Sequence, residues 1–154
     1  MRRLTLSLAC AAGIVVLAAA LGLLANAVSG AGVPLIAESA SPGRAIELVE
    51  ARRAHANGDV TFIDARHRDD YRAGHIAGSL STPLAERGAQ LEDLRRELPR
   101  TRPLVVYCEA GECTSAMVLG AWLSSNGWRD VRVLSGGYPG WAAAGFPISR
   151  GEGP

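Results

Sequence analysis

The chain has 154 residues, of which 16 are basic and 15 acidic, so its formal net charge is +1 at neutral pH with uncharged histidines. A balance this even offers no electrostatic basis for binding nucleic acid. Three cysteines are too few for a disulfide scaffold, and the three histidines are scattered singly without the spacing of metal ligands. We therefore expect no nucleic-acid partner, no cofactor and no metal site.

Residues 1–37 are predicted to be an N-terminal signal anchor that spans a membrane once. Between Arg3 and Glu38 the sequence contains no charged residue. A helix over Leu4–Val28 would be roughly 37 Å long at about 1.5 Å per residue, which is enough to cross a hydrocarbon core of about 30 Å. Arg2 and Arg3 precede it, and the positive-inside bias then keeps the N-terminus cytoplasmic and the following domain on the outer, periplasmic side.

A cleaved signal peptide is the alternative for the same segment. Ala25-Asn26-Ala27 has the small-x-small pattern of a cleavage site, so the domain would then be secreted after cleavage near Ala27. The uncharged run is longer than the core of a usual signal peptide, which favours the retained anchor. The domain is exported in both cases.

Residues 41–150 suit one small α/β domain. The expected elements, in chain order, are a helix over Ser41–His55 opened by Pro42, a strand over Val60–Asp64, a helical turn over Arg68–Ala73, an extended segment over Gly74–Pro83, an amphipathic helix over Leu91–Leu98, a strand over Pro103–Tyr107, a helix over Thr114–Asn126, a strand over Val131–Leu134 and a helix over Tyr138–Ala144. Strands separated by helices predict a mostly parallel sheet covered on both faces. Reactive groups in such folds lie at the carboxyl ends of the strands, where Asp64 and Cys108 stand.

Cys108 is the candidate nucleophile. It lies between the apolar run Leu104–Tyr107 and the helix expected from Thr114. At a strand-to-helix turn, converging backbone N–H groups and the positive end of the helix dipole favour the thiolate, which is the reactive form of cysteine. A cysteine buried at a strand end for packing alone is the competing interpretation.

Two motifs that flank this cysteine resemble those of the rhodanese family. The first is Asp64-Ala65-Arg66, followed by Tyr71, by Gly74–Ser79 (GHIAGS) and by Pro83, which is similar to the rhodanese pattern of D-x-R, a tyrosine and GHIxGA/S. The second is Leu134–Trp141 (LSGGYPGW), with Gly145 and Pro147, which is similar to the rhodanese GG-x-x-x-W signature. The resemblance covers nearly all of residues 41–150. It implies a five-stranded, largely parallel sheet flanked by helices, and transfer of a sulfane sulfur through a cysteine persulfide.

The loop after Cys108 departs from the rhodanese pattern C-x-x-G-x-R-S. The residues that follow it are Glu109, Ala110, Gly111, Glu112 and Cys113. The glycine matches, but Cys113 stands in the arginine's place, or else the loop is one residue longer and Thr114 stands nearest to that place. Both alignments lose the guanidinium and add two carboxylates, which oppose thiolate formation and repel thiosulfate where solvent does not screen them. The loop amides and the helix terminus act in the opposite direction.

The second cysteine of the loop suggests another chemistry. A disulfide needs Cα atoms about 4.4–6.8 Å apart, which a tightly curled loop allows for Cys108 and Cys113. In an oxidising compartment Cys108 would attack and Cys113 would resolve the product as a disulfide. The leading hypothesis is a membrane-anchored sulfurtransferase or persulfide carrier on Cys108, with a small sulfur donor, a thiol acceptor and a membrane-protein or redox partner. The alternatives are a thiol–disulfide oxidoreductase and a catalytically weak interaction module.

Asp64 and Arg66 are the candidate supporting residues. Arg66 matches the arginine that the rhodanese family has after its second strand, and it would either orient an anion or pair with Asp64 or Glu109. His75 in the GHI motif is expected to be architectural, and Trp128 is expected to pack in the core.

Overall fold

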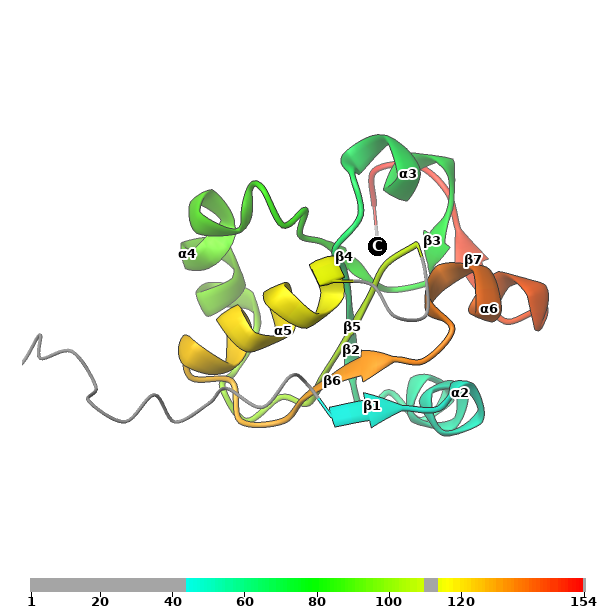
Figure 1. Ribbon diagram of the computed structural model, residues 1–154, viewed down its shortest axis with the longest axis horizontal. Helices are drawn as coiled ribbons and strands as arrows, with labels where there is room; N and C mark the ends of the chain where they lie inside the picture. Colours follow the sequence, from blue (N-terminus) through cyan, green and yellow to red (C-terminus); the bar gives the residue numbers. More distant parts are fainter. Residues whose placement is uncertain (1–43, 110–113, 154) are drawn as a thin grey trace, which may run out of the picture. The chain divides into compact units, whose positions relative to one another are not determined.

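The structure is a computed structural model that describes residues 44–109 and 114–153 (Figure 1). Its elements, in chain order, are β1 (Arg44–Ile46), α2 (Leu48–Ala56), β2 (Thr61–Asp64), α3 (Arg68–Ala73), β3 (His75–Ile76), β4 (Leu80–Ser81), α4 (Arg87–Glu97), β5 (Leu104–Tyr107), α5 (Thr114–Ser125), β6 (Val131–Leu134), α6 (Gly137–Ala143) and β7 (Ile148–Ser149). Within these residues no helix has the length and apolar character needed to cross a membrane. The predicted anchor, residues 1–37, lies outside the described residues.

Five strands form one sheet in the order β1-β6-β5-β2-β4. Every neighbouring pair in this sheet is parallel, which confirms the predicted mostly parallel sheet with flanking helices. The strands β3 and β7 pair separately and antiparallel. All four residues of β5 are buried, as expected for a central strand that is covered on both faces.

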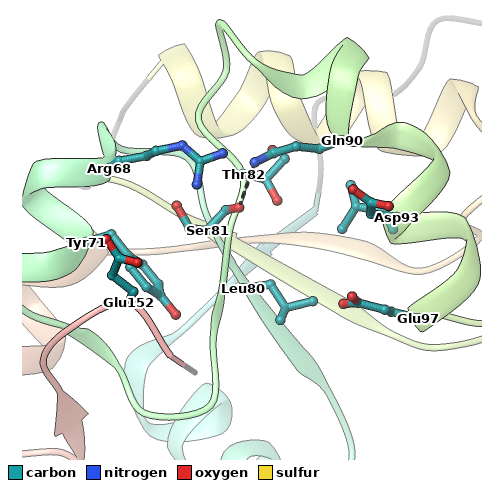
Figure 2. A pocket seen from close by; sticks show the side chains of 10 residues that line it. Arg68, Tyr71, Leu80, Ser81, Thr82, Gln90, Asp93, Glu97 and Glu152 are labelled. Carbon is teal, nitrogen blue, oxygen red and sulfur yellow. Dashed lines mark hydrogen bonds between the residues drawn. The ribbon is translucent and has the colours of Figure 1, made fainter.

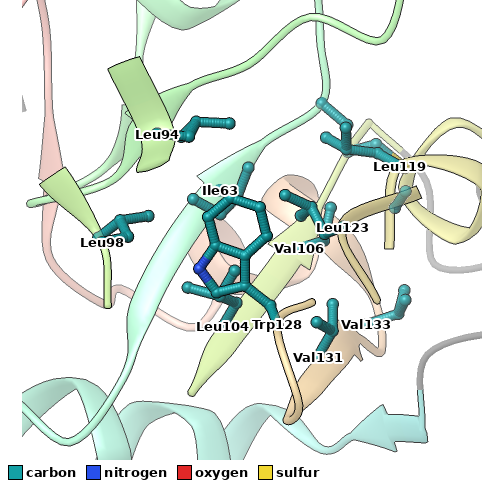
Figure 3. Packing of buried hydrophobic residues seen from close by; sticks show 13 residues of the cluster. Ile63, Leu94, Leu98, Leu104, Val106, Leu119, Leu123, Trp128, Val131 and Val133 are labelled. Atoms are coloured by element: carbon teal, nitrogen blue, oxygen red, sulfur yellow. The ribbon is translucent and has the colours of Figure 1, made fainter. Parts of the chain in front are cut away.

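Successive side chains of β5 enter two different clusters, one on each face of the sheet. Leu104 and Val106 pack with residues of α4 and α5 around Trp128 (Figure 3), while Val105 and Tyr107 pack with residues of α2 and α6 around Trp141. This alternation follows from the two-residue repeat of a strand. The indole of Trp128 is buried, as predicted, and the guanidinium carbon of Arg100 lies 3.9 Å from its ring centre.

The prediction of a helix beginning near Ser41 was wrong for residues 44–47. Arg44–Ile46 forms the edge strand β1, which pairs with Arg132–Leu134 of β6, and Glu47 is still extended before the helix begins at Leu48. Pairing buries Ile46 and lets its carbonyl accept a hydrogen bond of 2.9 Å from the backbone N–H of Ser135, which follows β6. A three-residue strand is too short to show alternation, so the Ser-Pro helix-start signal outweighed it.

Two other boundaries differ from the sequence-based expectation. The helix α4 begins at Arg87, four residues before the predicted Leu91. The sequence-based prediction missed this first turn because Gly88 weakens the helical signal there. The two-residue strand β7 was not predicted, and it exists through its pairing with His75 and Ile76. The segment predicted as extended over Gly74–Pro83 contains β3 and β4, as expected.

Helix α5 offers a test of this packing with an internal control. Leu119 is fully buried under the sheet, whereas Met117 in the same helix is 40% exposed. Leu119→Ala should lower the free energy of unfolding by about 2–5 kcal/mol, because a cavity remains where the side chain was. Met117→Ala should change it by less than about 0.5 kcal/mol. Equal losses for the two variants in urea unfolding would contradict this placement of α5.

Candidate active site

Cys108 directly follows β5, at the carboxyl edge of the sheet. Its side chain is buried, and its carbonyl oxygen accepts a hydrogen bond of 2.8 Å from the backbone N–H of Tyr138. Cys108 is disulfide-bonded in the structure. The predicted loop residues Ala110, Gly111, Glu112 and Cys113 lie outside the described residues, as does Cys10. Thr114 is exposed and is the first residue of α5.

Asp64 ends β2, the strand beside β5, and stands in register with Tyr107. Its carboxylate is completely buried and forms an ion pair with Arg66, whose Nη2 lies 2.7 Å from Oδ2. The Nε of Arg66 donates to both carboxylate oxygens, at 3.1 and 3.2 Å, and the backbone N–H of Arg66 donates to Oδ1 at 2.8 Å. The predicted supporting pair is therefore a single buried unit at the strand end next to the cysteine.

The guanidinium of Arg66 also reaches three other segments. Its Nη2 donates to the carbonyl oxygen of Gly74 at 2.6 Å, and its Nη1 donates to the carboxylate of Glu109 at 3.2 Å. Its central carbon lies 4.0 Å from the ring centre of Tyr138, within the range of a cation–π contact. Burial by itself lowers the pKa of Arg66. The hydrogen bonds to Asp64 and the charge of Asp64 raise the pKa by more than burial lowers it, so the pKa lies above its usual value. Arg66 is charged at every accessible pH.

Tyr107 places a buried hydroxyl beside this ion pair. It accepts a hydrogen bond from the backbone N–H of Ile76 at 3.2 Å and lies 2.9 Å from the hydroxyl of Ser79. Burial, together with the negative charge of Asp64, raises the pKa of Tyr107 above its usual value. The hydroxyl therefore stays neutral and serves to link the end of β5 to the segment that contains the GHI motif.

The side chain of His75 is fixed inside the fold by packing and hydrogen bonding. It is completely buried, its ring stacks on Tyr71 with the ring centres 3.7 Å apart, and its Nδ1 lies 2.8 Å from the carbonyl oxygen of Tyr71. These contacts agree with the architectural role expected for the motif. No group of three or more histidine, cysteine, aspartate or glutamate residues suited to a metal ion occurs in the described parts of the chain.

The structure thus brings four predicted residues to one place, namely Asp64, Arg66, Cys108 and Glu109. Sequence reasoning missed Tyr138, which both covers the guanidinium of Arg66 and bonds the carbonyl of Cys108. It also missed the carbonyl of Gly74 as an acceptor. Tyr138 lies inside the motif LSGGYPGW, so an aromatic residue beside the paired glycines was the available signal.

A cleft of about 220 Å³ lies beside β4, between α3 and α4 (Figure 2). Its polar lining includes Ser81, Thr82 and Gln90, whose side-chain oxygens are buried and make no hydrogen bond to the described residues. Ser81 stands in register with Asp64, and Asp64 with Tyr107, so the cleft lies two strands away from β5 along the same sheet edge. Cys108 is not among the residues that line it.

Residues 47–144 match the family model of the rhodanese-like domain. The chain belongs to the rhodanese-like domain family. The motifs that resembled this family in the sequence supply Asp64, Gly74 and Tyr138, which all contact the guanidinium of Arg66. Of these residues, Tyr138 also bonds the carbonyl of Cys108.

Three known proteins illustrate the range of this family. The chain is 35% identical over 111 residues to the HTH-type transcriptional regulator Rv0324 of Mycobacterium tuberculosis, a match over 72% of this chain and 47% of the regulator. It therefore spans about half the length of that relative. It is 32% identical over 96 residues to a sulfurtransferase of Allochromatium vinosum, over 62% of this chain and 83% of the relative. The solution structure of the rhodanese-like domain of the Alr3790 protein from Anabaena has a TM-score of 0.58 at 27% identity, over 73% of this chain and 81% of that one.

The close approach of Gly74 to Tyr138 tests the site. A Cβ added at Gly74 would overlap the hydroxyl of Tyr138, which is held by the stack on Arg66. Gly74→Ala should therefore lower the free energy of unfolding by about 1–3 kcal/mol, as overpacking does. Gly88→Ala is the control, because a Cβ there meets no atom within 4 Å in the described structure and lies in helix α4. It should stabilise by about 0.5–1 kcal/mol in the same urea titration, and two losses of equal size would refute the contact.

Proposed function

We propose that this rhodanese-like domain transfers or carries sulfane sulfur as a persulfide on Cys108. The observation that carries the proposal is the position of Cys108 in a rhodanese-like domain, at the end of β5 and immediately before the loop that leads into α5. Sulfurtransferases among the relatives support it. Another relative is a transcriptional regulator, so membership of the family alone does not define one activity.

The proposed reaction has two displacement steps. In the first, the thiolate of Cys108 attacks the outer sulfur of a donor such as thiosulfate, forms an S–S bond and releases sulfite, which leaves a persulfide anion on the cysteine. In the second, an acceptor thiolate attacks the terminal sulfur and takes it, and the thiolate of Cys108 is regenerated. The backbone N–H groups of residues 109–114 and the N-terminus of α5 are the groups proposed to stabilise the negative charge on sulfur.

A second candidate function is thiol–disulfide exchange by Cys108 and Cys113. The disulfide at Cys108 favours it, because a resolving cysteine would form such a bond. The two candidates also combine, since a disulfide at Cys108 must be reduced before the thiolate can accept sulfur. A redox partner that reduces it is part of this proposal.

The proposal includes anchoring by residues 1–37, with the domain on the outer side of the membrane. Its basis is the uncharged run after Arg3 and the two arginines before it. The full-length protein should stay in the membrane fraction after extraction with alkaline carbonate, and its intact mass should include residues 1–37. A soluble species whose mass begins near Val28 would instead support cleavage near Ala27.

Intact mass spectrometry tests the sulfur chemistry on the full-length protein after reduction and removal of the reductant. Exposure to thiosulfate or to a polysulfide should add one sulfur atom that dithiothreitol removes and that maps to Cys108. Cys108→Ser should lose this gain completely, because no other described residue has a thiol that could take the sulfur. Cys113→Ser should keep it.

The same spectra separate the alternatives. Sulfur gain in Cys108→Ser would overturn the assignment of the nucleophile. No gain in the unsubstituted protein, with a reversible Cys108–Cys113 disulfide, would move it to the oxidoreductase class. No gain and no reversible disulfide would leave an interaction module.

A further inference from the structure

The charges around Cys108 indicate which sulfur donors this site takes. Arg66 lies between two carboxylates, the buried one of Asp64 and that of Glu109, whose side chain is 67% exposed. One cation and two anions in contact leave this group with a net charge of −1. Glu109 adjoins Cys108 in the chain, so their Cα atoms are about 3.8 Å apart.

Four of the N–H donors of Arg66 are already engaged. A guanidinium has five N–H donors. The Nε and one Nη2 donor go to Asp64, the second Nη2 donor goes to the carbonyl of Gly74, and one Nη1 donor goes to Glu109. Tyr138 covers one face of the guanidinium, and only 4% of the side chain is exposed. At most one Nη1 donor is left over, so Arg66 cannot bind a substrate anion with two hydrogen bonds without losing one of these contacts.

The sequence after Glu109 adds no cation to replace it. Residues 110–113 contain one further glutamate and neither arginine nor lysine. The described side chains paired at this strand end are therefore one exposed carboxylate, that of Glu109, one buried carboxylate, that of Asp64, and one cation, Arg66, which is paired with both. Repulsion grows with the charge of the donor, so a dianion is penalised about twice as much as a monoanion at the same position.

We propose that Glu109 makes this site selective for sulfane sulfur donors that carry at most one negative charge, such as thiosulfonates and the persulfides of uncharged or zwitterionic thiols, and that it disfavours the thiosulfate dianion. The inference rests on the proposed persulfide chemistry at Cys108 and names its substrate class. The pairing with Arg66 fixes the carboxylate of Glu109, the residue that directly follows the nucleophile in the chain.

Two donors that differ in one group isolate this effect. Methanethiosulfonate carries a methyl group where thiosulfate carries a charged oxygen, and both offer the same outer sulfur. The thiolate of Cys108 attacks that sulfur in both cases. An S–S bond forms, the bond to the oxidised sulfur breaks with its electron pair, and the leaving group is methanesulfinate or sulfite. The persulfide anion on Cys108 is the common product.

The experiment measures single-turnover rate constants of persulfide formation on the reduced full-length protein at low ionic strength. Glu109→Gln should raise the thiosulfate rate constant by about two- to fivefold relative to that for methanethiosulfonate, the size of an exposed charge interaction. The change should disappear in about 1 M salt. Glu109→Asp, which keeps the charge, should retain most of the original ratio.

Glu50→Gln is the matched control. Glu50 is 63% exposed and lies 3.2 Å from Arg132, the same separation as between Glu109 and Arg66, but it belongs to α2. Its substitution should leave the ratio of the two rate constants unchanged.

The possible outcomes separate this inference from the one on which it rests. Persulfide formation with an unchanged ratio in Glu109→Gln, or an equal change in Glu50→Gln, overturns the role of Glu109 and leaves the sulfur chemistry standing. A ratio that shifts equally in Glu109→Asp also overturns it, because the cause would then be shape and not charge. No persulfide from either donor overturns both proposals.

Discussion

The buried ion pair between Asp64 and Arg66 is the interaction on which the geometry of this sheet edge depends. Moving two charges out of water costs several kcal/mol for each ion, and the cost is offset only when both are also well hydrogen-bonded. Here the carboxylate receives bonds from the Nε, the Nη2 and the backbone N–H of Arg66. Removing one partner would leave an uncompensated buried charge, at a cost of about 3–5 kcal/mol.

The pair connects segments that are far apart in the sequence. Arg66 follows β2, yet it bonds the carbonyl of Gly74 at the end of α3, covers the ring of Tyr138 in α6 and reaches Glu109 after β5. Tyr138 in turn bonds the carbonyl of Cys108. The backbone position of the candidate nucleophile is thus coupled to an ion pair on the neighbouring strand, although Asp64 and Arg66 need not take part in the chemistry.

The sequence predicted the parallel sheet and the strand end that carries Cys108 because those features depend on local patterns. An apolar run such as Leu104–Tyr107 and a helical period after Thr114 are visible without any tertiary information. The strand β1 was missed because only its pairing with β6 makes three residues a strand. Tyr138 was missed for the same kind of reason, since its stack on Arg66 joins residues 72 positions apart and no local pattern encodes it.

Because Arg66 is engaged by Asp64, Gly74 and Glu109, other groups must stabilise a charged sulfur at this site. The charge of Arg66 is matched by Asp64, and Glu109 adds one negative charge at the rim. The remaining source of positive potential is backbone, namely the N-terminus of the 12-residue helix α5 that follows the loop. A helix terminus acts like about half a positive charge and does not titrate with its neighbours. That suits one thiolate or persulfide anion, whereas a dianionic donor beside it would need a side-chain cation as well. On the proposed chemistry, a rhodanese-like domain whose loop has lost an arginine and gained carboxylates would keep the persulfide step while changing the charge of the donors that it admits.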